Sequence, residues 1–576
     1  MILNRYYESE LATLRETAVA FSKAHPAIAP MLAGASSDPD VERLLEGVAF
    51  LTGMVRQKLD DEFPEFIQEL AQLLFPHYLR PIPSATMIAF TPKAKLSERA
   101  TVQAGAAIGS TPVDGTSCVF RTCFKVDVDP LTIGQAQLVN APGSQPFIRL
   151  RIDCGADLAS MAADSLRLFL GASYSEASNL FLILSRYVEE IVVSAPGGSA
   201  LLLPPQALKH AGLDPAQVLI PYPPHAFPGY RLLQEYFVLP EKFLFVDLQG
   251  LSRWQGRGTG RSFDIEFRLS SVPEWMPEIR SDTFLMNVTP AINVFEHNAD
   301  PIQFDHKRPE YRVLPSGNTK GHYQIYAVDE VIGFEQGASG QKRYQPFGLF
   351  RHETAAAVEN YQLQRRDAAV GKGADLFISI AYRPDVAPKD ETLSLKISCT
   401  NGALPEGLRV GDISKPTDTS PERLAFRNIR VPTPHQMPPA GEGMLWRLLS
   451  HLSINFLSVA NRDNLCSLLQ LYLFSDGTAR GADSANQKRI DGIEAVEVAP
   501  ASRLVSGTMM RGRTVSIRCR SDSFASPGDL FVFGCVLEQF LGCYSSINSY
   551  TRCELHDVLT GETFRWPERV GQQPLI

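Results

Sequence analysis

Apolar residues recur at helical spacing in the first 80 residues of this 576-residue chain. Tyr7, Leu11, Leu14, Ala18 and Phe21 follow one another at gaps of 4, 3, 4 and 3 residues. This spacing places the five side chains along one face of an α-helix and is typical of a coiled-coil seam. The pattern therefore predicts a helix with a continuous apolar seam in this segment.

A second helix is predicted after Asp38-Pro39, because aspartate caps helices and proline fits their first turn. The same rhythm continues in its apolar positions, which are Val41, Leu45, Val48, Val55 and Leu59. A third apolar stripe runs from Glu65 to Phe75 and is closed by Pro76. Two interpretations stay open: three helices that share their own core, or seams that dock against helices of another chain. Under the second interpretation both seams are candidate partner-binding sites.

The chain changes character after Pro81. Short segments rich in Val, Ile, Thr and Phe alternate with turn residues, as in 263–269 and 393–399. Such segments predict β-strands, and loops rather than regular helices between them favour antiparallel sheets over a doubly wound nucleotide-binding fold. We expect two sandwich-like, β-rich domains, at 81–250 and 251–431.

The last third of the chain is mixed in pattern. Pro432–Pro439 holds four prolines in eight residues and predicts a linker. Beyond it we expect helices at 445–457 and 529–540, and strands at 513–520 and 550–555. The predicted fold class is therefore α+β, with an N-terminal helical segment (1–80), several antiparallel β-rich domains, and a mixed α/β C-terminal domain (432–576).

Charge and apolar content narrow the possible partners. The net charge is −8 at pH 7, with 44% hydrophobic and 20% charged residues, which is ordinary for a globular protein. An acidic chain has no global field that would attract nucleic acid or an anionic membrane. The longest apolar runs are much shorter than the roughly 20 residues of a membrane-spanning helix. We expect a cytoplasmic protein that does not insert into membranes.

Cysteines and histidines lack the spacing of disulfide scaffolds and metal sites. The nine cysteines are odd in number and contain no CxxC pair, which favours reduced, mostly buried thiols. His352-Glu353 begins like a zinc-protease motif, but Ala356 stands where the second histidine is required. Three further histidines, His297, His306 and His322, are more typical of polar loops than of a coordination sphere. We therefore predict no metal site.

Motifs for catalysis and cofactor binding are missing as well. The glycine-rich run 256–261 precedes a strand pattern rather than the helix that a phosphate loop requires, so we interpret it as a hairpin loop. No GxSxG or GxxxxGK[ST] string occurs. We predict no cofactor and no catalytic residues. A β-rich carbohydrate-active enzyme or lectin-like module stays open as the alternative, because one sequence does not show which carboxylates meet in space.

Several strings along the chain occur together in one known family. They are Asp61–Phe66 with Leu73–Ser84, Arg231–Phe237 with Pro240–Phe245, Thr289–Phe295, Glu310–Val313, and Gly534–Leu541 with Tyr544–Tyr550. In this order, and over nearly the whole chain, they resemble the TssF (ImpG/VasA) family of type VI secretion proteins. Val294 and Tyr550 stand where many relatives have leucine and phenylalanine, and both keep the apolar bulk.

The resemblance implies a structural subunit of the baseplate wedge in a contractile, phage tail-like injection machine, and not an enzyme. Such a subunit associates with TssG and with a second copy of itself, and TssE and TssK join the wedge. Wedges assemble around the VgrG spike beneath the contractile sheath, in a baseplate docked at the inner-membrane complex. A bundle of helices ties the wedge proteins together, and we assign the two N-terminal seams to that bundle as a hypothesis.

Overall fold

The computed structural model divides the chain into two compact units. One comprises Met1–Leu79 and Ala440–Leu452, and the other Arg80–Pro439 and Ser453–Ile576. The structure describes residues 2–24, 39–40, 42–56, 75, 77–93, 96, 98–161, 163–223, 226–258, 260–318, 320–335, 340–347, 360–367, 374–380, 390–438, 461–473, 480–505, 508–545, 547 and 549–571. The third predicted stripe, apart from Phe75, and the predicted helix at 445–457 lie outside these residues. The four predicted domain ranges stay predictions.

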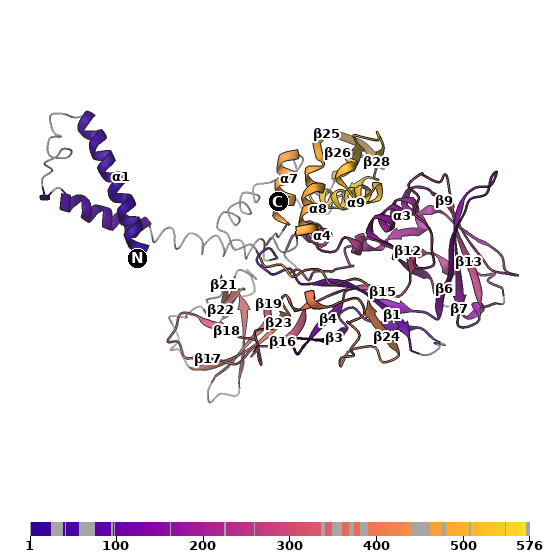
Figure 1. Cartoon of the computed structure of the whole chain (residues 1–576), viewed down its shortest axis with the longest axis horizontal. Helices are drawn as coiled ribbons and strands as arrows, with labels where there is room; N and C mark the ends of the chain where they lie inside the picture. Colours follow the sequence, from indigo (N-terminus) through magenta and orange to yellow (C-terminus); the bar gives the residue numbers. More distant parts are fainter. Residues whose placement is uncertain are drawn as a thin grey trace. The chain divides into compact units, whose positions relative to one another are not determined.

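The smaller unit holds two described helices. α1 spans Ile2–Ala24, drawn in indigo in Figure 1, and a second helix covers residues 42–56. Both lie where the apolar spacing predicts helices. Neither contains proline, and the second runs without a break through its two glycines, Gly47 and Gly53.

The larger unit contains a five-stranded sheet whose order is β24-β1-β15-β4-β3. Its strands are β1 (Ala85–Pro92), β3 (Ala107–Val113), β4 (Thr116–Thr122), β15 (Val288–Ile292) and β24 (Leu424–Asn428), and β2 (Ala100–Val102) pairs with β5 (Val126–Val128) nearby. β1 is paired on both sides, with Ala85 opposite Ile292 and Ile88 opposite Asn428. Segments more than 300 residues apart in the sequence therefore share one sheet.

Two further sheets lie between β5 and β15 in the sequence. One has the order β10-β9-β13-β7-β6, formed by β6 (Leu131–Val139), β7 (Phe147–Cys154), β9 (Val188–Ser194), β10 (Leu201–Leu203) and β13 (Ser262–Leu269). The other has the order β11-β12-β8-β14, formed by β8 (Ser165–Leu170), β11 (Leu208–His210), β12 (Phe245–Gln249) and β14 (Phe284–Leu285). In β13 the apolar residues are buried and the charged residues alternate with them, which is the pattern of a sheet with one solvated face.

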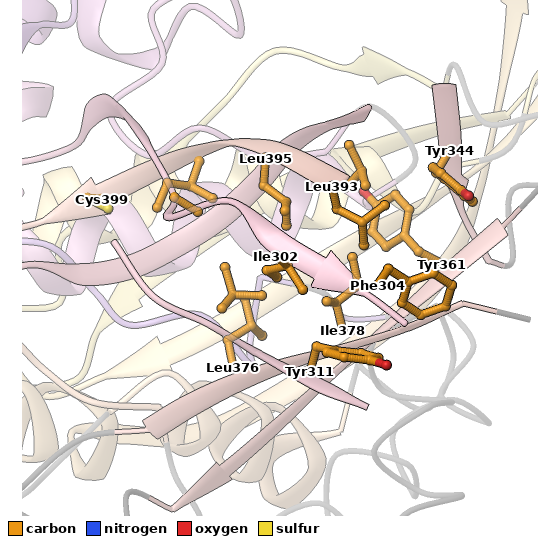
Figure 2. Close-up of a cluster of buried hydrophobic side chains, with 14 of the residues drawn as sticks. Ile302, Phe304, Tyr311, Tyr344, Tyr361, Leu376, Ile378, Leu393, Leu395 and Cys399 are labelled. Atoms are coloured by element: carbon orange, nitrogen blue, oxygen red, sulfur yellow. The ribbon is translucent and has the colours of Figure 1, made fainter. Parts of the chain in front are cut away.

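The sheet formed by residues 295–400 closes into a barrel. Its order is β16-β23-β19-β20-β21-β22-β18, with β17 paired to β23. Its strands are β16 (Phe295–Asn298), β17 (Ile302–Phe304), β18 (Tyr311–Val313), β19 (Gln324–Glu335), β20 (Gln341–Pro346), β21 (Asn360–Asp367), β22 (Ala374–Ile380) and β23 (Glu391–Thr400). The two ends of this order meet, because Ala299 bridges Pro315 and the Ser316 amide donates to the Asn298 carbonyl over 2.9 Å. Figure 2 shows the buried cluster inside it, where Phe304, Ile378 and Leu393 lie close together.

The C-terminal sheet is long and carries helices against one face. It has the order β25-β26-β27-β28, with β29 paired to β27. The strands are β25 (Ile493–Val505), β26 (Thr508–Cys519), β27 (Ser549–Asp557), β28 (Thr563–Arg565) and β29 (Arg569–Val570), and α7 (Arg462–Leu471) and α8 (Arg480–Asp491) precede them. Among the described strand pairs, only β26–β27 and β20–β21 are parallel. The predicted strands at 513–520 and 550–555 correspond to β26 and β27, and the predicted α+β class is confirmed.

Helix α9 (Pro527–Cys543) is buried between α3 (Tyr174–Arg186) and α4 (Pro228–Val238). Ser526 caps its N-terminus by accepting a hydrogen bond from the Asp529 amide over 3.1 Å. Gly528 allows α3 to approach, because a Cβ there would lie 2.1 Å from the carbonyl carbon of Ser178. The predicted buried helix at 529–540 is thus confirmed, and its capping begins three residues earlier. Short 3₁₀ turns join other elements at Leu158–Ser160, Pro205–Ala207, Ala211–Leu213, Pro240–Phe243, Leu251–Arg253, Leu404–Gly407 and Ser521–Ser523.

Two interpretations of the sequence need correction. The glycine-rich run 256–261 is not a hairpin loop, because it connects β12 in one sheet to β13 in another. Arg257 holds this crossing by donating to the carbonyls of Met161, Trp254 and Leu251. The proline-rich segment is not a free linker over its described part, since Gln436 exchanges two backbone hydrogen bonds with Ile82.

Candidate partner-binding surface

The two helices of the smaller unit pack as an antiparallel pair. Arg15 forms an ion pair with Glu42 at 3.0 Å, while Arg56, at the other end of the second helix, pairs with Glu10. Gly53 sets the close approach near the start of α1, because a Cβ there would lie 3.2 Å from the backbone nitrogen of Tyr7. The second helix therefore turns one face, with Ala49 and Gly53 buried, toward α1.

The predicted seam on α1 is mostly covered. Tyr7, Leu11, Leu14 and Ala18 are half-buried, whereas Phe21 remains 43% exposed. The single face that the spacing predicts is real, and Tyr7 lies against Gly53 of the second helix. Other residues of the chain thus cover part of most side chains in this seam. The seam therefore offers less surface to a partner than its spacing suggests.

The predicted seam on the second helix divides between two faces. Leu45 is half-buried, whereas Val48 and Val55 are 38% and 60% exposed. Val41 and Leu59 lie outside the described residues. Leu45 therefore belongs to the side that faces α1, and Val48 and Val55 belong to the solvent side.

The exposed side of the second helix carries four apolar residues that we call the outer stripe. They are Leu44, Val48, Leu51 and Val55, at gaps of 4, 3 and 4, and Leu44 and Leu51 are 70% and 64% exposed. Leu44 and Leu51 were not among the predicted positions. The 4-3-4 spacing that starts at Leu44 was the signal that could have found them, and it competed with the equally regular series that starts at Val41.

Beside the outer stripe lies a second exposed group, the side stripe, formed by Gly47, Phe50 and Met54. Phe50 and Met54 are 45% and 47% exposed, and nothing lies within 4 Å of a Cβ placed on Gly47. No exposed position between Arg43 and Arg56 carries a charge. Solvent-exposed helical faces normally carry charged residues, so a stretch this long without them marks an interaction surface.

A shallow pocket opens at the end of the outer stripe. Leu51, Thr52 and Val55 line it, and the ion pair between Glu10 and Arg56 forms its rim. An apolar base with a charged rim suits one aliphatic or aromatic side chain of a protein partner.

Residues that could support chemistry have structural roles in the described part of the chain. His297 contacts the Ser316 carbonyl and His322 contacts the Thr116 hydroxyl, each at 2.8 Å. No three His, Cys, Asp or Glu side chains among the described residues gather to hold a metal ion. All nine cysteines are unpaired, and burial raises the pKa of the Cys118 thiol to about 11. None of the described helices is both long and apolar enough to span a membrane.

The family model "Type VI secretion system, TssF" matches residues 2–573 of the chain. The chain belongs to the TssF family. It is 30% identical to the type VI secretion system component TssF1 of Pseudomonas aeruginosa, over 99% of both chains. The resemblance seen in the ordered strings is confirmed.

Solved structures of TssF-like chains agree in fold. A chain of the type VI secretion TssK-TssF-TssG baseplate subcomplex, determined by cryo-electron microscopy, matches 92% of this chain and 98% of its own, at 31% identity and a TM-score of 0.79. A chain of a type VI secretion baseplate complex matches 100% of both at 26% identity and a TM-score of 0.63. The TssF fold therefore extends over both units of this chain.

The strings that resemble the TssF family hold the fold together. Glu235, buried at 1% exposure, accepts hydrogen bonds from the amides of Leu219 and Ile220 at 2.8 and 3.0 Å and pairs with Lys242 at 2.5 Å. Asn293 donates to the Val119 carbonyl over 2.8 Å and so ties the first sheet to the start of the barrel. These polar side chains fix loops and sheets, so their role in this TssF protein is architectural.

Proposed function

We propose that this TssF protein is a structural subunit of the type VI secretion baseplate wedge, and that it acts by holding neighbouring subunits and not by catalysis. Two solved relatives support this role, because each lies in a baseplate assembly and one of them stands there with TssK and TssG. The family match favours the scaffold over the carbohydrate-active alternative. On this proposal the protein is cytoplasmic and its baseplate docks at the inner-membrane complex.

The observation that carries the proposal is the width of the apolar surface on the second helix. Successive residues of an α-helix are turned by about 100°, so the outer and side stripes have centres about 100° apart and span an arc of about 160° together. The face toward α1, marked by Ala49, lies opposite this arc. An exposed apolar arc this wide is typical of a helix that partners cover.

One partner helix cannot cover such an arc, because a coiled-coil contact uses a single narrow stripe. We therefore assign two partner helices to the second helix, in addition to α1. The outer stripe, with its 4-3-4 spacing, binds a helix of TssG. The side stripe, where Gly47 allows a close approach, binds a helix from a second copy of this chain.

The remaining partners follow from the wedge role. TssK and TssE join the wedge through surfaces other than the two stripes. The VgrG spike and the contractile sheath lie near the assembled wedges without being held by the apolar surface. Large interfaces built from many modest contacts suit a platform that must release its contacts when the sheath contracts.

The test introduces negative charge into the outer stripe. In Leu51→Asp combined with Val55→Asp, two carboxylates face the partner helix, and we expect loss of co-purification with TssG. Both side chains are exposed, so the chain itself should keep its helical content by circular dichroism. Leu11 and Leu14 are less suitable positions, because they are half-buried and aspartate there would also disturb the helix pair.

The matched control introduces the same charges elsewhere on the pair. Thr13→Asp with Thr17→Asp places two carboxylates, also four residues apart, at exposed positions of α1. This variant should bind TssG as the unmodified chain does. Co-purification retained by the Leu51 and Val55 variant would exclude the outer stripe as the TssG site.

A further inference from the structure

The pairing of β1 with β24 continues beyond the sheet. The register runs from Pro92 opposite Leu424 to Ile88 opposite Asn428. Past β24, the Ile429 amide donates to the Met87 carbonyl, and the Thr433 amide to the Ala85 carbonyl, each over 2.8 Å. Finally Ile82 and Gln436 exchange backbone hydrogen bonds of 2.8 and 3.0 Å. We call residues 82–86 and 429–436 together the proline arm.

Prolines remove amide donors from the proline arm, and several of the donors that remain are bonded to side chains or to the opposite strand. Pro83, Pro432 and Pro434 have no N–H group and hold φ near −65°, which stiffens both strands. The Ala85 amide donates to the Thr433 hydroxyl over 2.9 Å, and the His435 amide to the Glu406 carboxylate over 3.1 Å. A proline-rich segment of this kind is a stiff element of the fold and not a solvated tether.

The proline arm is also attached sideways. The Thr86 hydroxyl donates to the Arg430 carbonyl over 2.7 Å, and the Arg430 guanidinium donates to the carbonyls of Gly171 and Ala172 at 2.7 and 2.6 Å. On the other side, the Asn293 amide donates to the Ser84 carbonyl over 2.8 Å. The arm is therefore held by the sheet that begins with β24 and by the loop before α3.

The proline arm stands where the chain passes between the two units. Ile82 lies two residues after Arg80, where the larger unit begins, and Gln436 lies three residues before Pro439, where the chain passes back to the smaller unit. Two of the passages between the units thus run through the paired strands of one arm. The third passage, between Leu452 and Ser453, lies outside the arm. Force that a partner exerts on the smaller unit can therefore enter the larger unit along these strands, although they are not its sole route.

We propose that the proline arm transmits force from the helices of the smaller unit to the sheet containing β1, β15 and β24. Tension at Arg80 pulls β1 along its own axis. The hydrogen bonds to both neighbouring strands run across that axis, so they share the load and must break together. A flexible linker would lengthen before any force reached the sheet. The inference goes beyond the baseplate role and does not depend on which partner binds the helices.

Amide hydrogen exchange of the intact chain tests whether the arm is stiff. The amides of Ile82, Thr433 and Gln436 should exchange at least about 100-fold more slowly than in an unfolded peptide. The double variant Thr86→Val with Thr433→Val removes two side-chain hydrogen bonds of the arm, and amide exchange in the arm should become about tenfold faster. Exchange of these three amides at unfolded-peptide rates in the unmodified chain would overturn the proposal.

Single-molecule stretching tests whether the arm bears load. The chain is held by tags at its two ends, so that tension passes through Arg80 into β1. We expect the Thr86 and Thr433 variant to lengthen first at a clearly lower force than the unmodified chain. The control, Thr91→Val with Thr132→Val, replaces exposed strand hydroxyls outside the arm and should leave that force unchanged. Equal forces in the two variants would overturn the transmission of force through the arm even if the arm is protected from exchange.

Discussion

The guanidinium of Arg489 donates from Nε to Oδ2 of Asp529 over 3.0 Å in the interior of the larger unit. Asp529 is fully buried and also accepts hydrogen bonds from the hydroxyls of Tyr174 and Tyr236 at 2.8 and 3.2 Å. Burial, reinforced by the neighbouring Asp529, raises the pKa of the Tyr236 hydroxyl, which therefore stays neutral. One carboxylate thus joins side chains from α3, α4, α8 and α9.

Loss of the arginine should destabilise the larger unit strongly. In Arg489→Met the Asp529 carboxylate would remain buried without a counter-charge, which costs about 3–5 kcal/mol in comparable pairs. Urea unfolding followed by circular dichroism measures the change. The double variant Arg489→Met with Asp529→Leu removes both charges and should recover part of the loss. Strict additivity of the two single variants would contradict the coupling.

The ion pair between Glu235 and Lys242 should behave asymmetrically. Lys242→Met leaves the Glu235 carboxylate with its two amide donors, at Leu219 and Ile220, whereas Glu235→Leu leaves a buried ammonium and two unpaired amides. We expect Glu235→Leu to lower the free energy of unfolding by about 1–3 kcal/mol more than Lys242→Met does. Thermal unfolding of the two variants under the same conditions compares them. The opposite order would show that the amides find other partners.

Two histidines, the buried His435 and the half-buried His210, should make stability depend on pH. Burial lowers the pKa of His435 to about 4, and burial with the nearby Arg186 and Lys209 lowers that of His210 to about 4, from 6.5. The unfolded chain therefore binds more protons between pH 6.5 and 4. Above pH 6.5 both states hold neutral histidines and the full stability is present. As the pH falls from 6.5 to 4, the free energy of unfolding decreases by up to about 1.4 kcal/mol per pH unit for each histidine.

A double variant that carries both His210→Gln and His435→Gln isolates this effect when it is compared with the unmodified protein. The double variant should lose less stability between pH 7.5 and 5 in urea unfolding. A double variant with an unchanged slope would assign the pH dependence to other groups.

The two glycines of the second helix should respond oppositely to alanine. Gly47→Ala meets no atom within 4 Å and should stabilise the free helix pair by about 0.5–1 kcal/mol. Gly53→Ala places its Cβ 3.2 Å from the Tyr7 nitrogen and should give no such gain, because α1 must shift. Circular dichroism during heating, which follows the loss of helical content, compares the two variants. A gain at Gly53 equal to that at Gly47 would contradict the close packing at Tyr7.

Local patterns predicted most elements, because they depend on neighbours in the sequence. The alternation in 263–269 predicts β13, and the apolar run at 529–540 predicts α9. Leu44 and Leu51 of the outer stripe were not predicted, since the second helix offers several regular apolar series and the sequence does not show which one faces α1. The partner of Gln436 lies about 350 residues away, so prolines near it resembled a linker. The pairing of Glu235 with Lys242 was hidden for a different reason, because charged residues close in sequence are usually solvated.

The closure of the barrel between Asn298 and Ser316 matters for the proposed assembly of this chain with a second copy of itself. An open sheet presents backbone donors and acceptors that a neighbouring copy can capture, which leads to strand exchange or aggregation. Where β16 and β18 meet, these groups are already satisfied within one chain. Crowded copies can therefore press their barrels together through side chains alone, and each copy can separate again without exchanging strands.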